Sequence, residues 1–169
     1  MNVSTPTPPG LSPVGGMKIV AQFDGGLLSW EGGVLVLREV EQRLGVADRM
    51  AACMAACIAD PRAPDQITAS VADIIRFGLL MIAAGYEDGA DAHSLGSDPV
   101  FKLAHDLAAS ERQLCSQSTI SRLENLADAR ALLRRGRAMV DLYCESFKQA
   151  PVARPPRQLA ANADPAARR

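Results

Sequence analysis

The chain has 169 residues, of which 48% are apolar and 22% are charged, so it is long enough for one domain and apolar enough to bury a core. No apolar run approaches the roughly 20 residues that cross a bilayer, and four cysteines are too few for a disulfide scaffold, which excludes a membrane-spanning protein and a disulfide-rich secreted domain. The net charge of −1 combines −4 over residues 1–150 with +3 over residues 151–169, so the total alone does not exclude a nucleic-acid partner.

The first residues indicate a tail followed by a small β element. Residues 1–16 are rich in Pro, Gly, Ser and Thr and are expected to be disordered, because they have too little apolar surface to bury. Residues 18–23, KIVAQF, are short, apolar and partly β-branched, which predicts a strand that ends at the DGG of residues 24–26. Together with the apolar pair at residues 27–28, this strand predicts a small hairpin.

Apolar residues then take helical spacing. The pattern predicts a first helix over residues 34–44, with Gly45 as its C-cap. A second helix has its apolar face within residues 50–58 and closes at Asp60-Pro61. The low aromatic content, 4%, and the many alanines agree with a helical chain.

A third predicted helix is the candidate centre of the fold. Ser70 and Asp73 have the spacing of a capping box at its start, and Gly85 ends it. Apolar residues occupy much of its circumference, so we expect this helix to be buried.

Three further helices follow an acidic, turn-rich segment at residues 86–97, which has room for one short helix. Pro99 after Asp98 predicts a helix start, because proline at the first helical position loses no hydrogen bond. The last two helices are predicted over residues 116–126 and 127–147. The longer one has an apolar stripe that contains Leu133, Val140, Cys144 and Phe147.

The expected fold class is therefore mainly α, with about six helices, a small N-terminal β-hairpin or strand, and disordered termini. We assign the helical domain to residues 17–150. It lies between the tail at residues 1–16 and a second, basic tail at residues 151–169, which is proline-rich and has no apolar periodicity.

The first candidate functional segment is residues 116–123, SQSTISRL. In helix-turn-helix proteins a short turn precedes a helix whose N-terminal part enters the major groove of DNA. Hydroxyls of Ser118, Thr119 and Ser121 can reach base edges or phosphates there. Arg122 adds a charge-assisted contact to phosphate or guanine. The alternative is a serine-rich helix cap without a ligand.

The second candidate is a run of arginines on the last predicted helix: Arg130, Arg134, Arg135 and Arg137. Arg130 and Arg134 are four residues apart and share a face. With Arg122, these side chains can form the positive patch that an acidic domain otherwise lacks. The alternative is a solvated helix face whose charge is balanced by neighbouring acids.

Metal chemistry is the weakest of the candidate functions. Cys53 and Cys57 are four apart on a helix, but they share its apolar face and no second cysteine pair follows, so we interpret them as small buried hydrophobes. His93 and His105 stand alone and receive no role. A group of acids falls beside predicted helix starts, where carboxylates cap helices: Glu87, Asp88, Asp91 and Asp98. We assign no metal ligand.

Four segments, in this order, resemble one family. They read FDGGLLSWEGGVLVLREVEQRLG, IIRFGLLMIAAGYED, DAHSLGSDPVFKLA and LCSQSTISRLENL. The chain resembles the N-terminal part of the DDE-type (group 1) transposases of bacterial insertion sequences over about residues 18–150. Its GYED followed by SDPVFKL, and SQSTISRLEN further on, carry most of the resemblance.

The resemblance implies a role in DNA transposition within the bacterial cytoplasm, with nucleoid association when the protein is bound to DNA. Members of this family bind the ends of their own element, and they cut and rejoin DNA with acidic residues on an RNase H-like core that uses a divalent metal such as Mg²⁺. The matched region is the helical part before that core. The implied partners are transposon ends, full-length transposase and a second copy of the chain.

The sequence departs from the family after residue 150. In the family an apolar strand with the first catalytic aspartate follows the long helix, whereas this chain reads PVARPPRQLAANADPAARR. Asp164 has no strand pattern around it and receives no catalytic role. We therefore expect a truncated, catalytically inactive fragment without a cofactor. The rival hypothesis is a non-DNA protein-interaction or oligomerisation module, which the acidic balance and the apolar central helix favour.

Overall fold

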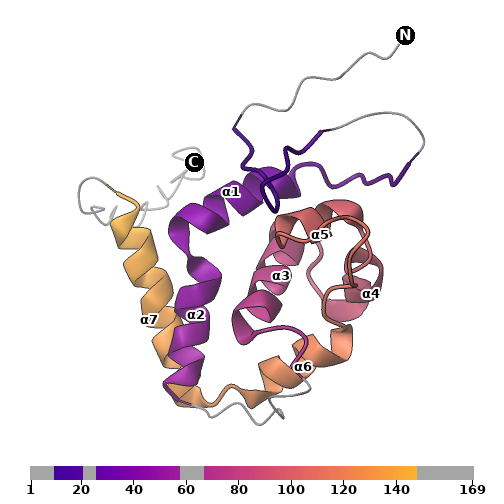
Figure 1. Cartoon of the computed structure of the whole chain (residues 1–169). Helices are drawn as coiled ribbons and strands as arrows, with labels where there is room; N and C mark the ends of the chain where they lie inside the picture. Colours follow the sequence, from indigo (N-terminus) through magenta and orange to yellow (C-terminus); the bar gives the residue numbers. More distant parts are fainter. Residues whose placement is uncertain (1–9, 21–25, 58–66, 148–169) are drawn as a thin grey trace, which may run out of the picture.

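A computed structural model describes residues 10–20, 26–57 and 67–147, and this part is mainly helical, as predicted (Figure 1). It contains no strand and seven α-helices, together with a short 3₁₀ helix, η2 (Gly89–Asp91). The α-helices are α1 (Val34–Leu44), α2 (Val46–Ala55), α3 (Val71–Ala83), α4 (Ala92–Leu95), α5 (Pro99–Ala104), α6 (Gln117–Leu126) and α7 (Ala129–Glu145). No described helix is long and apolar enough to cross a membrane.

Helix α3 is the centre of the fold, as its sequence predicts. Its capping box is formed, because the Ser70 hydroxyl accepts the Asp73 N–H at 3.0 Å while the Asp73 carboxylate accepts the Ser70 N–H at 3.2 Å. Phe77 is fully buried, and its ring meets the buried Phe101 ring of α5 edge to face at a centroid distance of 5.8 Å. The α1, α2, α4, α5 and α6 helices contribute further core side chains around it, together with Ala69 just before α3.

Two buried charges on α1 connect it to its neighbours. The Glu41 carboxylate accepts the N–H groups of Val46 and Ala47 at 3.0 and 3.1 Å, so it satisfies the first amides of α2. Arg38 donates to the backbone carbonyl of Ser12 at 3.1 Å and forms an ion pair with Asp106 beyond the end of α5. Because both charges have partners, their burial fixes how α1, α2 and α5 meet.

These contacts explain where α2 begins. The sequence placed the apolar face of this helix within residues 50–58 and gave no start for it, and α2 starts at Val46, directly after the left-handed Gly45 that ends α1 as predicted. Glu41 supplies the cap that makes this start stable. The predicted end at residues 60–61 lies outside the described residues.

The predicted N-terminal hairpin is wrong for the residues that the structure describes. Residues 18–20 and 26–28 form no ladder, and the N-terminal segment has only an isolated bridge between Val14 and Met17. Residues 18–20 form no strand, because the described part of the chain offers no neighbouring strand to pair with them. Residues 21–25 lie outside the described part of the chain.

Residues 10–17 make contacts that a tail would lack. Gly15 and Gly16 both have positive φ, which allows a tight turn that places Val14 in the body with only 4% of its surface exposed. The Ser12 N–H and hydroxyl donate to the Glu39 carboxylate at 2.9 and 2.7 Å, and these hydrogen bonds lower the pKa of Glu39. Residues 1–9 and the tail expected at residues 151–169 lie outside the described ranges.

The last predicted helix is present as α7, and its apolar stripe lies on the outer side. The helix begins at its N-cap Asp128 and has Ala131 and Leu142 buried. The stripe that the sequence indicated faces solvent, with Leu133 70% exposed and Val140 60% exposed. The reason is that α7 carries two apolar faces, and α2 packs against the one that contains the alanines.

Truncating the central aromatic residue should destabilise the whole body. We expect Phe77→Ala to lower the free energy of unfolding by about 3–5 kcal/mol, since the side chain is fully buried and leaves a cavity. The matched control Leu28→Ala removes a side chain that is 66% exposed and should cost less than about 0.5 kcal/mol. Urea unfolding followed by circular dichroism measures both, and equal losses would contradict the central position of Phe77.

Candidate nucleic-acid interface

The first turn of α6 presents unpaired hydrogen-bond donors beside a group of hydroxyls. The Ser116 hydroxyl lies 3.0 Å from the hydroxyls of both Ser118 and Thr119, and it does not cap a backbone amide. In the part of the chain that the structure describes, the N–H groups of Gln117 and Ser118 have no hydrogen-bond partner. Free amides and hydroxyls at a helix start are the groups that hold a phosphate.

Helix α6 has one buried and one outward face. Ile120 and Leu123 are buried in the core, whereas Ser118 and Arg122, four residues apart, are exposed. Asn125 lies one turn further along the outward face and is also exposed. Asn125 was not predicted from the sequence, although its spacing of seven residues from Ser118 could have indicated the same face. Its side-chain amide can form the paired hydrogen bonds that suit adenine.

The segment before α6 is longer than the short turn that the sequence pattern suggested. It spans residues 105–116, whereas helix-turn-helix turns have about three or four residues. A buried lysine orders it, because Lys102 Nζ donates to the carbonyls of Ala109 and Glu111 at 3.2 and 3.0 Å. The Leu114 N–H donates to the Gly96 carbonyl at 3.0 Å, which fixes the chain just before α6 begins.

The arginines on α7 differ in their surroundings. Arg130 is exposed and has no ion-pair or hydrogen-bond partner among the described residues, and the same is true of Arg122 on α6. Arg134 Nη1 donates to the Ala56 carbonyl at 3.4 Å, at the negative end of α2. Arg135 is half-buried and has a smaller free surface.

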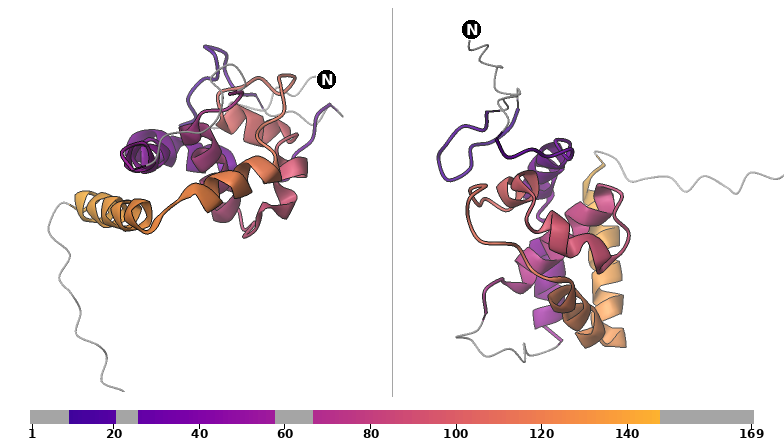
Figure 2. Two further views of the ribbon diagram at one scale, coloured as in Figure 1. Left: turned by 90° about the horizontal axis from the view of Figure 1, so that it is seen from below. Right: turned by 90° about the vertical axis from the view of Figure 1, so that its right-hand side faces the viewer.

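Helices α6 and α7 follow one another along one edge of the body, separated only by Ala127 and Asp128 (Figure 2). This connection brings the C-terminal end of α6 next to the start of α7. The structure therefore places the predicted hydroxyls and Arg122 on α6, and Arg130 on the neighbouring helix α7. Arg134 differs from them because it contacts the Ala56 carbonyl at the end of α2, and Arg135 differs because it is half-buried.

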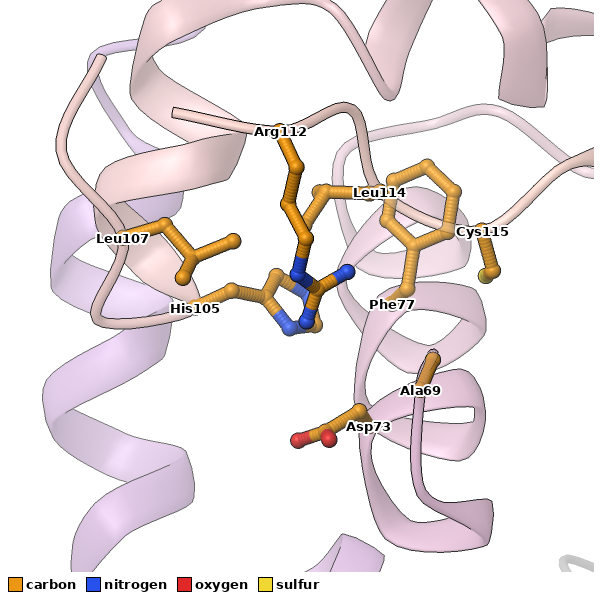
Figure 3. Close-up of a pocket in the computed structure, with 8 residues that line it drawn as sticks. All are labelled: Ala69, Asp73, Phe77, His105, Leu107, Arg112, Leu114 and Cys115. Carbon is orange, nitrogen blue, oxygen red and sulfur yellow. The ribbon is translucent and has the colours of Figure 1, made fainter. Parts of the chain in front are cut away.

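A cavity of about 230 Å³ lies between α3 and the segment that precedes α6 (Figure 3). The His105 ring points into it and meets the Phe77 ring at a centroid distance of 5.8 Å. Burial, with a further contribution from the positive charge of Arg76, lowers the pKa of His105 to about 4. Its Nε2 has no hydrogen-bond partner within the described residues.

The remaining cavity groups give no reactive centre at neutral pH. Burial raises the pKa of the Cys115 thiol to about 11, so the thiolate that a nucleophile needs is not populated. Arg112 and Asp73 line the opening, but Asp73 is already engaged in the capping box and in a 3.0 Å ion pair with Arg76. The cavity is therefore a poor candidate for covalent or acid–base chemistry.

The cysteines and acids considered as metal ligands can be placed in the structure. Within residues 10–20, 26–57 and 67–147, no three His, Cys, Asp or Glu side chains are placed to hold a metal ion. Cys53 and Cys57 are free and half-buried. Asp88 caps Ala90, and Asp98 accepts the Val100 N–H at 2.8 Å, so these two acids cap helices as predicted.

In a comparison with protein-family models, residues 11–153 match the family described as transposase DDE domain group 1. Comparison with curated proteins and comparison with solved structures gave no significant match. The matched range contains every described helix, including the outward face of α6 and the arginines of α7.

The buried histidine should make the folded state sensitive to mild acid. The pKa of His105 is about 4 when folded and near 6.5 when unfolded, so the unfolded chain binds more protons between these values. The stabilisation is complete above pH 6.5 and is lost as the pH falls toward 4, by as much as about 3 kcal/mol.

Urea unfolding at pH 7.5 and at pH 5 tests this expectation. The variant His105→Phe should lose less stability between the two pH values than the unmodified chain. The control His93→Phe changes an exposed histidine on α4 and should keep the original difference. The same pH difference in all three proteins would contradict the burial of a neutral His105.

Proposed function

The chain belongs to the transposase DDE domain group 1 family, and from this premise we propose that its helical body binds the DNA ends of a bacterial insertion sequence and assembles the transposase on them. Family membership supports a role in transposition. The DNA-binding part of the proposal rests on the first turn of α6. This turn is exposed, its first N–H groups have no partner among the described residues, and the hydroxyls of Ser116, Ser118 and Thr119 cluster beside them.

Local charge supports this use of α6 although the body is acidic. Residues 1–150 carry a net charge of −4, so DNA contact has to be confined to a small basic region. Arg122 and Arg130 provide charges that have no ion-pair partner among the residues that the structure describes, and Arg134 lies one turn beyond Arg130. In this proposal Ser118, Thr119, Ser121 and Arg122 contact bases and adjacent phosphates, while the α7 arginines contact the phosphate backbone.

The described residues are assigned no catalytic role in this proposal. The family's chemistry uses a divalent metal held by several acids, and no such group of side chains comes together in residues 10–20, 26–57 or 67–147. The residues present therefore do not fit the metal, and no strand-cleavage step is derived through it. Asp164 lies outside the residues that the structure describes.

A second candidate function, protein interaction without DNA, is favoured by the exposed apolar face of α7. The two functions are compatible, because the outward face of α6 and the apolar face of α7 use different side chains. Binding to DNA that does not weaken as salt is added would favour protein interaction alone.

Removing the free arginine of α6 should weaken binding to the terminal repeat of the element that encodes the chain. We expect Arg122→Ala to cost about 1–3 kcal/mol, or roughly 5- to 150-fold in affinity, and to reduce the salt dependence of binding. Fluorescence anisotropy with a labelled terminal-repeat duplex at several salt concentrations measures both effects.

The matched control is Arg43→Ala, which removes the same charge from the last turn of α1, at the opposite end of the body (Figure 1). Its affinity should stay within about twofold of the unmodified chain. Equal affinities for Arg122→Ala and the unmodified chain, or equal losses in the two variants, would show that α6 is not the contacting helix. A scrambled duplex of the same length separates sequence recognition from non-specific attraction.

A further inference from the structure

The outer face of α7 is an apolar surface that no other described helix covers. Leu133 is 70% exposed, Val140 60% and Tyr143 57%, and each lies away from the face that packs on α2. Phe147, just after the helix, is 44% exposed, and its ring stacks edge to face on Tyr143 at a centroid distance of 4.8 Å. A contiguous apolar patch of this kind is a typical protein-interaction site.

The spacing of this patch is that of a helix–helix contact. Leu133, Val140 and Phe147 are seven residues apart, and Gly136 and Tyr143 fall at the intermediate positions of the same heptads. Residues at alternating spacings of three and four form one continuous seam along a helix. The partner that this face fits is therefore another helix.

Nothing among the described residues explains why position 136 is a glycine. It lies inside α7, where glycine costs about 1 kcal/mol relative to alanine, and its backbone needs no positive φ. A Cβ added to Gly136 would meet nothing within 4 Å, so no packing inside the body requires its small size. The missing side chain leaves the helix backbone open, which lets a second helix approach closely.

Two opposite charges flank the open groove at Gly136. Arg137 and Asp141 line it together with Leu132, Leu133 and Val140. Arg137 and Asp141 are four residues apart on one helix, a spacing at which opposite charges can pair. Neither of them forms an ion pair within the described residues. A partner that presents an acid opposite Arg137 and a base opposite Asp141 would satisfy both charges.

A second copy of α7 in antiparallel orientation is such a partner. A two-fold axis perpendicular to the helix near Met139 places Arg137 of each copy opposite Asp141 of the other, and it joins the two apolar seams. We propose that the outer face of α7 is the interface of a symmetric dimer of this chain, with two antiparallel α7 helices in contact at Gly136 and two Arg137–Asp141 ion pairs between copies. This inference deepens the assembly part of the proposed function.

Charge exchange between copies tests the dimer without DNA, so its outcome is independent of DNA-end binding. Alone, Arg137→Asp places two acids together at each end of the interface, and Asp141→Arg places two bases together, so each variant should dimerise at least about tenfold more weakly than the unmodified chain. An equimolar mixture of the two variants should form a heterodimer, because every acid then faces a base. Sedimentation velocity and native mass spectrometry measure these species in the full chain.

A pair of charged substitutions tests the apolar seam of α7. Val140→Glu and Val36→Glu introduce the same charge at positions that are each 60% exposed, on α7 and on α1. We expect Val140→Glu to give a monomer with unchanged helicity by circular dichroism, and Val36→Glu to remain dimeric.

Three results would overturn the proposal. The first is an unmodified chain that stays monomeric up to about 100 µM, well above the micromolar dissociation constants of weak complexes, and this would leave the α7 face to another protein or to the segment after residue 147. The second is a dimer that Val36→Glu disrupts and Val140→Glu does not. The third is a mixture of Arg137→Asp and Asp141→Arg that dimerises no better than either variant alone.

Discussion

Helix α7 is held to the body through one face only, and the functional surfaces of the molecule depend on this constraint. Ala131 and Leu142 are buried on that face, and an ion pair of 2.8 Å between Arg49 and Glu145 fixes the C-terminal half of α7 against α2. The thiol of Cys53 lies 3.8 Å from the Arg134 carbonyl and marks the other end of the contact. Because α2 is the helix that α7 packs against most extensively, the outer side of α7 is free for the proposed contacts with DNA and a partner chain.

The body provides the rigid platform that this arrangement needs. Glu41 joins the end of α1 to the start of α2, and its carboxylate also lies 3.5 Å from Arg76 on the central helix. Lys102 performs a similar task at the other side, because it orders the segment that leads into α6. Both are buried charges with satisfied partners, and both connect the core around Phe77 to the helices that carry the candidate interface.

Elements governed by local chemistry could be predicted from the sequence, and elements governed by distant contacts could not. The left-handed Gly45, the capping box of Ser70 and the Asp98-Pro99 start depend on neighbouring residues and are confirmed. The hairpin failed because strand formation needs a partner elsewhere in the chain. The sequence could not decide which face of α7 is buried, because either of its apolar faces satisfies helical periodicity and only the position of α2 decides between them.

The residues of the candidate interface also divide into those that the sequence indicates and those that only the tertiary structure reveals. The hydroxyls of α6 and Arg122 follow from the sequence pattern, whereas the outward position of Asn125 and the contact of Arg134 with Ala56 require the tertiary structure. Two α7 helices in contact would join two copies of α6, so one assembly could engage two DNA ends at once.

Hydrogen–deuterium exchange of the full chain, with and without a terminal-repeat duplex, tests whether α6 contacts DNA and whether α7 joins two copies. If both hold, DNA slows amide exchange in residues 116–126 and at the start of α7, while exchange in α1 stays unchanged. The residues of α7 around Gly136 are then already protected without DNA at concentrations where the chain is dimeric. Protection confined to other helices, with α6 exchanging equally in both samples, would show that α6 is not the DNA-contacting helix.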